Sequence, residues 1–198
     1  MGAGLFDLSP LIFVYRIHGG EPPIRGRRIR VRSTDSSPSY RLQTKLNDHF
    51  SLWQGYAWVG NYQPSFREEN RVYQQLLYRR KFPFVKVLSR TRLEERFIDN
   101  SDGTAVRART MLRSDFPLPD APEWAIVVYD EIFVNVNAVG NGPDSGFDQN
   151  RLFLGMIRQF TEHFNMDLGY QMQALNNRQL ALINQINHII LLQFFINL

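Results

Sequence analysis

The most concentrated chemistry in the sequence is a group of charged side chains spaced two residues apart. The group consists of Arg90, Arg92, Glu94 and Arg96 in residues 84–98, and of Arg107, Arg109 and Arg113 in residues 106–115. Because successive side chains of a β-strand point to opposite faces, this spacing puts the charges of each segment on one face. Arginine and glutamate on neighbouring strands would then pair across the sheet, so the spacing predicts a ladder of ion pairs.

Other polar residues share this face by the same alternation in later segments. They are Glu131, Asn135, Gln149, Arg151, Asp167, Gln171 and Gln173. Removing an ion from water without a partner costs several kcal/mol, so we interpret the set mainly as a paired structural interior. The alternative is a narrow pore or pocket for a small anionic solute, because rings of arginine favour anions.

The opposite face of the same segments holds a few polar residues among apolar neighbours. Ser89 and Glu95 share one face of their segment, and His188 shares a face with apolar residues near the C-terminus. A serine, a histidine and an acid can form a hydrolytic set in which the histidine deprotonates the serine. Ser89, His188 and Glu95 are therefore candidates for a lipid-modifying acyl hydrolase. No motif joins them, however, and the sequence favours a non-enzymatic protein with no catalytic set.

Nothing in the sequence predicts a metal or another cofactor. The chain has no cysteine, which excludes disulfide scaffolds, thiolate zinc sites and thiol catalysis. Its four histidines are scattered and do not have the spacing of a metal-binding helix. No glycine-rich phosphate loop or nucleotide-binding fingerprint occurs either.

Alternation with period two dominates the chain from residue 40 onward and predicts an all-β fold. The expected strands lie near 40–46, 50–62, 70–82, 84–98, 106–116, 123–137, 148–160, 164–175 and 187–198. Most of these exceed ten residues, whereas strands of soluble proteins usually have roughly five or six. About nine to eleven tilted residues cross a bilayer.

Two architectures fit such alternation. In a soluble β-sandwich the polar face meets water, and in a membrane barrel the apolar face meets lipid while the polar face lines the lumen. Short connections at 47–49, Pro83 and 161–163 alternate with long ones at 61–69, 138–147 and 176–186, and aromatic residues gather near strand ends. Both features favour an antiparallel up-and-down transmembrane β-barrel, with a soluble β-sandwich binding module as the alternative.

The net charge of +4 is concentrated at the start of the chain. Residues 1–40 contain six arginines and three acidic residues, which gives +3, and no aromatic residues interleave with the arginine run at 25–32. Basic residues without stacking partners are weak indicators of nucleic-acid binding. We therefore expect no nucleic-acid partner.

Six segments resemble a known bacterial family, the domain of unknown function 2490. They are SLWQGYAW (51–58), VYQQLLYR (72–79), SRTRLEERF (89–97), DEIFVNVN (130–137), FDQNRLFLG (147–155) and MDLGYQMQ (166–173), followed by NH at 187–188. The resemblance covers about residues 40–198. It implies an outer-membrane β-barrel of a Gram-negative bacterium with no established biochemical activity. The implied partners are outer-membrane lipids, lipopolysaccharide and the barrel-assembly machinery.

Residues 1–39 do not resemble the family, and no signal peptide is recognisable in them. We expect this segment to be flexible or aberrant and to lie outside a barrel domain at 40–198. Outer-membrane barrels have an even number of antiparallel strands, and nine strands cannot close one. The sequence therefore predicts a barrel of about nine or ten strands that lacks the first strands of the family.

Overall fold

Ten β-strands make up the described part of this computed structural model, which comprises residues 11–17, 39–62, 66–176 and 185–196. The strands are β1 (Leu11–Ile17), β2 (Ser39–Lys45), β3 (Phe50–Tyr62), β4 (Phe66–Lys81), β5 (Lys86–Ile98), β6 (Thr104–Leu118), β7 (Ala121–Asn135), β8 (Gly146–Gln159), β9 (Phe164–Leu175) and β10 (Gln185–Ile196). Among these residues, no helix is long and apolar enough to cross a membrane.

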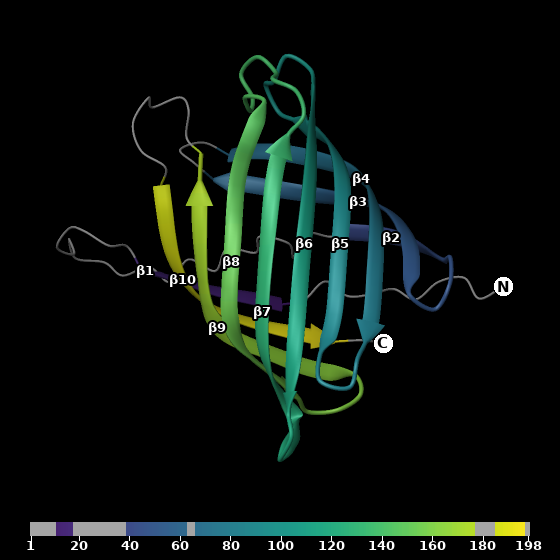
Figure 1. The fold of residues 1–198 in the computed structure, drawn as a ribbon. Coiled ribbons are helices and arrows are strands. Elements are labelled where there is room, and N and C mark those ends of the chain that lie inside the picture. Colours follow the sequence, from purple (N-terminus) through teal and green to yellow (C-terminus); the bar gives the residue numbers. More distant parts are fainter. Residues whose placement is uncertain (1–10, 18–38, 63–65, 177–184, 197–198) are drawn as a thin grey trace.

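All ten strands belong to one antiparallel sheet. From β2 to β10 each strand pairs with the next one along the chain, and β1 pairs with β10. The up-and-down, all-β prediction is therefore confirmed. The sheet is strongly curled (Figure 1), but its two edge strands, β1 and β2, are not hydrogen-bonded to each other in the described residues, so the sheet is not closed. Because the strands form one sheet rather than two packed sheets, the β-sandwich alternative is wrong.

Two predicted connections are shorter in the structure. The loop expected at 61–69 is shorter, because β3 continues to Tyr62 and β4 begins at Phe66 and buries Glu69 in an ion pair. The gap between the strands expected at 106–116 and 123–137 is only a turn at 119–120, because β6 and β7 include their prolines, with an irregularity in register after Pro117. Of the remaining described connections, 136–145 is clearly longer than those at 46–49, 82–85 and 160–163 at the other end of the strands, whereas 99–103 is of similar length to them.

Part of the segment that we expected outside the sheet joins it. In β1, Leu11–Ile17 runs antiparallel to β10, from Leu11 opposite Phe194 to Ile17 opposite His188. Its sequence, LIFVYRI, is rich in β-branched and aromatic residues, which favour a strand. The remainder of 1–39, apart from Ser39 at the start of β2, lies outside the described residues.

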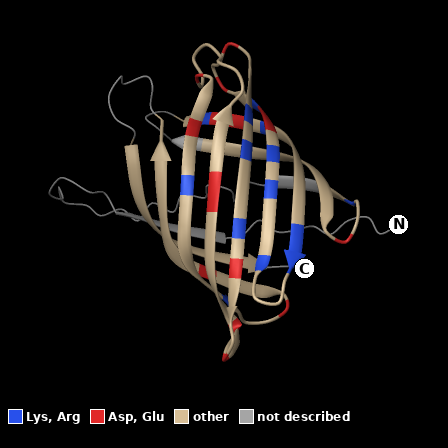
Figure 2. Cartoon of the chain, in the orientation of Figure 1, with Lys and Arg blue, Asp and Glu red and all other residues tan. Residues whose placement is uncertain are grey.

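Burial divides the sheet into two faces of opposite character. The buried face carries charged residues such as Glu94, Arg109 and Asp167, which have 1%, 3% and 0% of their surface exposed. The exposed face carries large apolar residues such as Leu112 and Leu154, which are 55% and 58% exposed. Figure 2 shows the charges along the strands rather than only in the loops. Buried charges and exposed large apolar side chains are each less common in soluble proteins than the reverse.

A small apolar layer interrupts the polar interior. Val127, Tyr129, Phe153 and Leu191 form a buried cluster from β7, β8 and β10. The rings of Tyr129 and Phe153 are stacked, with centroids 4.7 Å apart and planes 11° apart. The interior is therefore filled by side chains at this level.

Candidate functional site

The structure places all the predicted interior residues on the buried face of the sheet. Strand register then brings them into contact. Glu94 in β5 lies opposite Arg107 in β6, and Glu131 in β7 lies opposite Arg151 in β8. These pairings join side chains that are distant in the chain, so that β5–β8 together form one charged interior.

Glu94 is the centre of this interior. Its Oε2 atom lies 2.6 Å from Nη2 of Arg107, and its Oε1 atom lies 3.2 Å from Nε of Arg109 and 3.5 Å from Nη1 of Arg92. Arg92 also donates from Nε and Nη2 to the amide oxygen of Gln75, at 2.9 and 2.6 Å. One buried carboxylate therefore holds guanidinium groups from two strands.

Glu131 links the next set of arginines. Its Oε1 atom accepts a hydrogen bond of 2.8 Å from Nη2 of Arg90 and lies 3.7 Å from Nε of Arg109, while its Oε2 atom lies 3.9 Å from Nη1 of Arg151. Arg109 therefore joins Glu131 to Glu94. We call the connected set the central network; it comprises Arg90, Arg92, Arg107, Arg109, Arg151, Glu94, Glu131 and Asp148, whose Oδ2 lies 3.2 Å from Nη1 of Arg107.

A second group of charged residues lies near the start of β4 and the end of β5. Glu69 accepts hydrogen bonds from Nε and Nη2 of Arg96, at 2.6 and 3.2 Å, and the same pair of bonds from Arg71. Glu69 falls in the loop expected at 61–69, and Arg71 was not among the predicted interior residues. The alternation of residues 69–77 was the available signal, because Glu69, Arg71 and Gln75 share one parity.

A third group lies toward the other end of the strands. Arg113 donates from Nη1 to Oδ2 of the fully buried Asp167 at 2.6 Å, and from Nε to Asp115 at 2.7 Å. Near the apolar layer, the hydroxyl of Tyr129 donates to Oε1 of Gln171 at 2.8 Å. These contacts satisfy polar groups that burial would otherwise leave without partners.

A separate set of amide side chains lies near the start of β8, the end of β9 and the start of β10. Gln173 donates to Oε1 of Gln149 at 2.5 Å, and Asn187 donates to Oε1 of Gln173 at 3.3 Å. Asn135 is also buried, and its Oδ1 atom makes no hydrogen bond in the described structure. The predicted amide residues therefore lie inside.

Aromatic rings support the guanidinium groups. The ring of Phe133, which is fully buried, has the guanidinium carbons of Arg151, Arg107 and Arg109 at 4.7, 5.1 and 5.5 Å from its centroid. Arg92 lies 4.0 Å from the centroid of Tyr73. Cation–π contacts of this kind are strongest where water is excluded.

The residues proposed for hydrolysis are not brought together. Ser89 lies on β5 and His188 on β10, with β6–β9 between them in the sheet. His188 instead stacks on Tyr170, and its Nδ1 atom forms a hydrogen bond with the Tyr170 hydroxyl. Glu95 lies on the outer face of β5, beyond reach of His188. The three candidates Ser89, His188 and Glu95 therefore do not form a serine–histidine–acid set.

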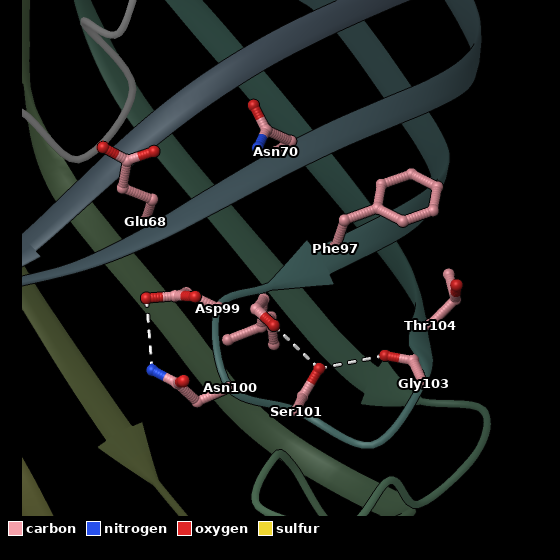
Figure 3. Close-up of a pocket in the computed structure, with 9 residues that line it drawn as sticks. Glu68, Asn70, Phe97, Asp99, Asn100, Ser101, Gly103 and Thr104 are labelled. Carbon is pink, nitrogen blue, oxygen red and sulfur yellow. Dashed lines mark hydrogen bonds between the residues drawn. The ribbon is translucent and has the colours of Figure 1, made fainter.

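A polar pocket lies on the outer face of β4–β6 near the loops (Figure 3). It has a volume of about 470 Å³ and is lined by Glu68, Asn70, Phe97, Ile98, Asp99, Asn100, Ser101, Gly103 and Thr104. The Ser101 hydroxyl lies 2.8 Å from the carbonyl oxygen of Ile98 and 2.9 Å from that of Gly103, so its single hydrogen can be donated to either or shared between them. In the part of the chain that the structure describes, neither this pocket nor any other place gathers three residues that could hold a metal ion.

Comparison with known proteins agrees with the sequence motifs. Residues 33–183 match the family described as "Protein of unknown function (DUF2490)". The chain belongs to this family. An uncharacterised protein of Methylorubrum extorquens (strain AM1) is similar to it, with 32% identity over 158 residues that cover 77% of this chain and 68% of that protein. The resemblance to DUF2490 is confirmed, with a match that starts at 33 rather than at about 40 and ends at 183.

Proposed function

We propose that this DUF2490 chain is an outer-membrane β-barrel protein whose interior is closed by ion pairs and packed rings, and that it has a structural role in the envelope. The observation that carries the proposal is the inverted distribution of side chains. The buried face holds carboxylates and guanidinium groups, and the exposed face holds large apolar residues. Lipid on the outside and a polar lumen on the inside account for both.

The outer wall is too apolar for a surface in water. Exposed aliphatic residues occur on β4–β10, and include Leu76, Leu93, Leu112, Ile126, Ile132, Leu152, Leu154, Leu168 and Ile190. A soluble monomer rarely exposes a contiguous apolar patch larger than about 300–600 Å². A wall that continues over neighbouring strands is better matched by acyl chains, so lipids and lipopolysaccharide are the proposed partners, with the barrel-assembly machinery acting during insertion.

The interior supports a lumen filled by side chains rather than a wide channel. Glu69, Glu94 and Glu131 each contact two or more guanidinium groups. Beside them, the stacked rings of Tyr129 and Phe153 pack with Val127 into the apolar layer. Such contacts leave little room for a column of water.

Substituting outward-facing residues tests the membrane proposal. Ile132→Arg places a charge on the exposed face of β7, where Ile132 is 44% exposed. In lipid this change should destabilise the protein by about 2–4 kcal/mol near the midplane, whereas at a water-exposed site it should shift stability by about 0.5 kcal/mol or less. Glu123→Arg, at an exposed position near the turn end of the same strand, is the matched control.

The readouts are fractionation of cells and mobility of the unheated protein on a detergent gel. We expect wild type and Glu123→Arg in the outer-membrane fraction with heat-modifiable mobility, and a large loss of the folded band for Ile132→Arg. Soluble wild-type protein that folds without detergent, with Ile132→Arg equally stable, would refute the proposal.

A further inference from the structure

The central network contains more arginines than carboxylates. Arg90, Arg92, Arg107, Arg109 and Arg151 stand against Glu94, Glu131 and Asp148, an excess of two positive charges among the described members. An ion kept from water needs an opposite charge nearby, or it costs several kcal/mol. The two members whose described carboxylate contact is Glu131 alone, Arg90 and Arg151, are therefore the ones that favour an additional anion.

Arg151 is the member least satisfied by protein groups. Its closest carboxylate contact in the described structure is Nη1 to Oε2 of Glu131 at 3.9 Å, and its buried Nε makes no hydrogen bond there. Glu131 is closer to Arg90, at 2.8 Å. The Nε of Arg90 also makes no hydrogen bond in the described residues. Two guanidinium groups beside Glu131 thus retain donors for a further acceptor.

The ring of Phe133 holds these charges close together. Arg107, Arg109 and Arg151 all lie within 5.5 Å of its centroid, measured from their guanidinium carbons. Glu94 lies between Arg107 and Arg109 and offsets their repulsion, whereas the carboxylate contact of Arg151 is the longer one of 3.9 Å to Glu131. Guanidinium groups are suited to oxyanions, because their planar N–H donors match two oxygens at once.

The part of the central network that contains Arg90, Arg151 and Asp148 is partly exposed to solvent. The side chains of Arg90, Arg151 and Asp148 are 23%, 17% and 27% exposed, whereas those of Glu94 and Arg109 are 1% and 3% exposed. The outer parts of the Arg90 and Arg151 side chains are therefore open to solvent, although their Nε atoms are buried. The pocket in Figure 3 lies on the opposite, outer face and does not contribute.

We propose that the central network binds a small, multiply charged oxyanion of the phosphate or sulfate class, held by Arg151 and Arg90 beside Phe133. This inference rests on the proposed function, because it places the site in the interior of the barrel. It goes beyond that function by giving the interior a ligand.

Calorimetric titration of the folded, detergent-solubilised chain with inorganic phosphate tests the site, with chloride at matched ionic strength as the reference. We expect saturable binding of phosphate to wild type and a loss of about tenfold or more in affinity for Arg151→Met, since one charge-assisted contact has this magnitude. Arg158→Met is the matched control; Arg158 lies on the same strand, stacks on Trp124 and is exposed. Its affinity for phosphate should equal that of wild type.

Arg151→Lys is a second variant for the case in which Arg151→Met does not fold. It keeps the charge and removes the planar fork, so its phosphate affinity should fall less than that of Arg151→Met. Absence of saturable phosphate binding by wild type, or unchanged binding by the folded Arg151 variants, would overturn the site. A soluble chain that still binds phosphate through Arg151 would refute the membrane proposal alone, and a heat-modifiable membrane protein that binds none would refute the anion site alone.

Discussion

Gly155 and Gly169 lie opposite each other in β8 and β9, and the ring of Phe153 occupies the space beside them that side chains would fill. A Cβ atom added at Gly155 would lie 2.6 Å from Cζ of Phe153, 2.8 Å from Cα of Gly169 and 2.4 Å from the carbonyl oxygen of Leu168. The two glycines therefore allow Phe153 to lie flat against the inner wall and stack on Tyr129.

Gly155→Ala should destabilise the protein by about 1–3 kcal/mol, because the new methyl group meets backbone atoms that cannot easily move. Urea titration of the folded band in detergent measures the loss. Gly60→Ala is the control, since its added Cβ would meet only ring atoms of Phe66 and Trp58, at 2.9 Å or more. An effect at Gly155 no larger than that at Gly60 would contradict the packing described.

Glu94→Gln should lower the free energy of unfolding by about 3–5 kcal/mol, because it removes the carboxylate that Arg107 and Arg109 share inside the sheet. The measurement is equilibrium unfolding in denaturant. Glu123→Gln, at an exposed position near a turn, should leave the stability within about 0.5 kcal/mol of wild type.

A double variant separates pairing from simple loss of a side chain. Glu94→Gln combined with Arg107→Gln should be less destabilised than the sum of the two single variants, because the second change removes a charge that the first left without its partner. Additive effects of the two substitutions would show that the pair is not coupled.

Asp130→Leu should stabilise the protein in detergent or lipid by about 1–2 kcal/mol, because Asp130 is a carboxylate on the otherwise apolar outer face of β7. Its described partner is Asn150, which donates from Nδ2 to Oδ1 at 2.5 Å and is 3.4 Å from the carbonyl oxygen of Glu131. Thermal unfolding in lipid vesicles measures the change. A clear loss of stability would indicate that this outer face meets something more polar than acyl chains.

Planar bilayers should stay electrically silent when wild-type protein is inserted, because ion pairs and the apolar layer fill the interior. Conductance that falls on substitution of Arg92 or Arg109 would support the narrow anion pore instead. Insertion must be verified independently, by protease protection of vesicles from the same preparation.

Much of the fold follows from local pattern. Alternation with period two identifies the strands and their two faces, because side-chain direction in a strand depends only on parity. For this reason Arg90, Glu94 and Arg109 could be placed on one face from the sequence. The same alternation cannot tell which face meets lipid or water, and the burial in the structure distinguishes the inner side.

Pairing within the interior depends on register. Glu94 meets Arg107 and Arg109, and Glu131 meets Arg90, only because β5, β6 and β7 align at particular residues. A shift of one residue would exchange the two faces of a strand, and a shift of two would change every partner. Local sequence does not encode these long-range choices, and the expected ladder therefore had no assigned partners.

The sequence by itself determined an antiparallel all-β chain with a polar face and an apolar face. It also determined the resemblance to the DUF2490 family and most residues of the charged interior. Only the tertiary structure decided that Glu69 belongs to that interior, that β1 completes the edge beside β10, and that Ser89 and His188 lie four strands apart. The physical reason is that parity along a strand is local, whereas register and sheet order arise from contacts between residues far apart in the chain.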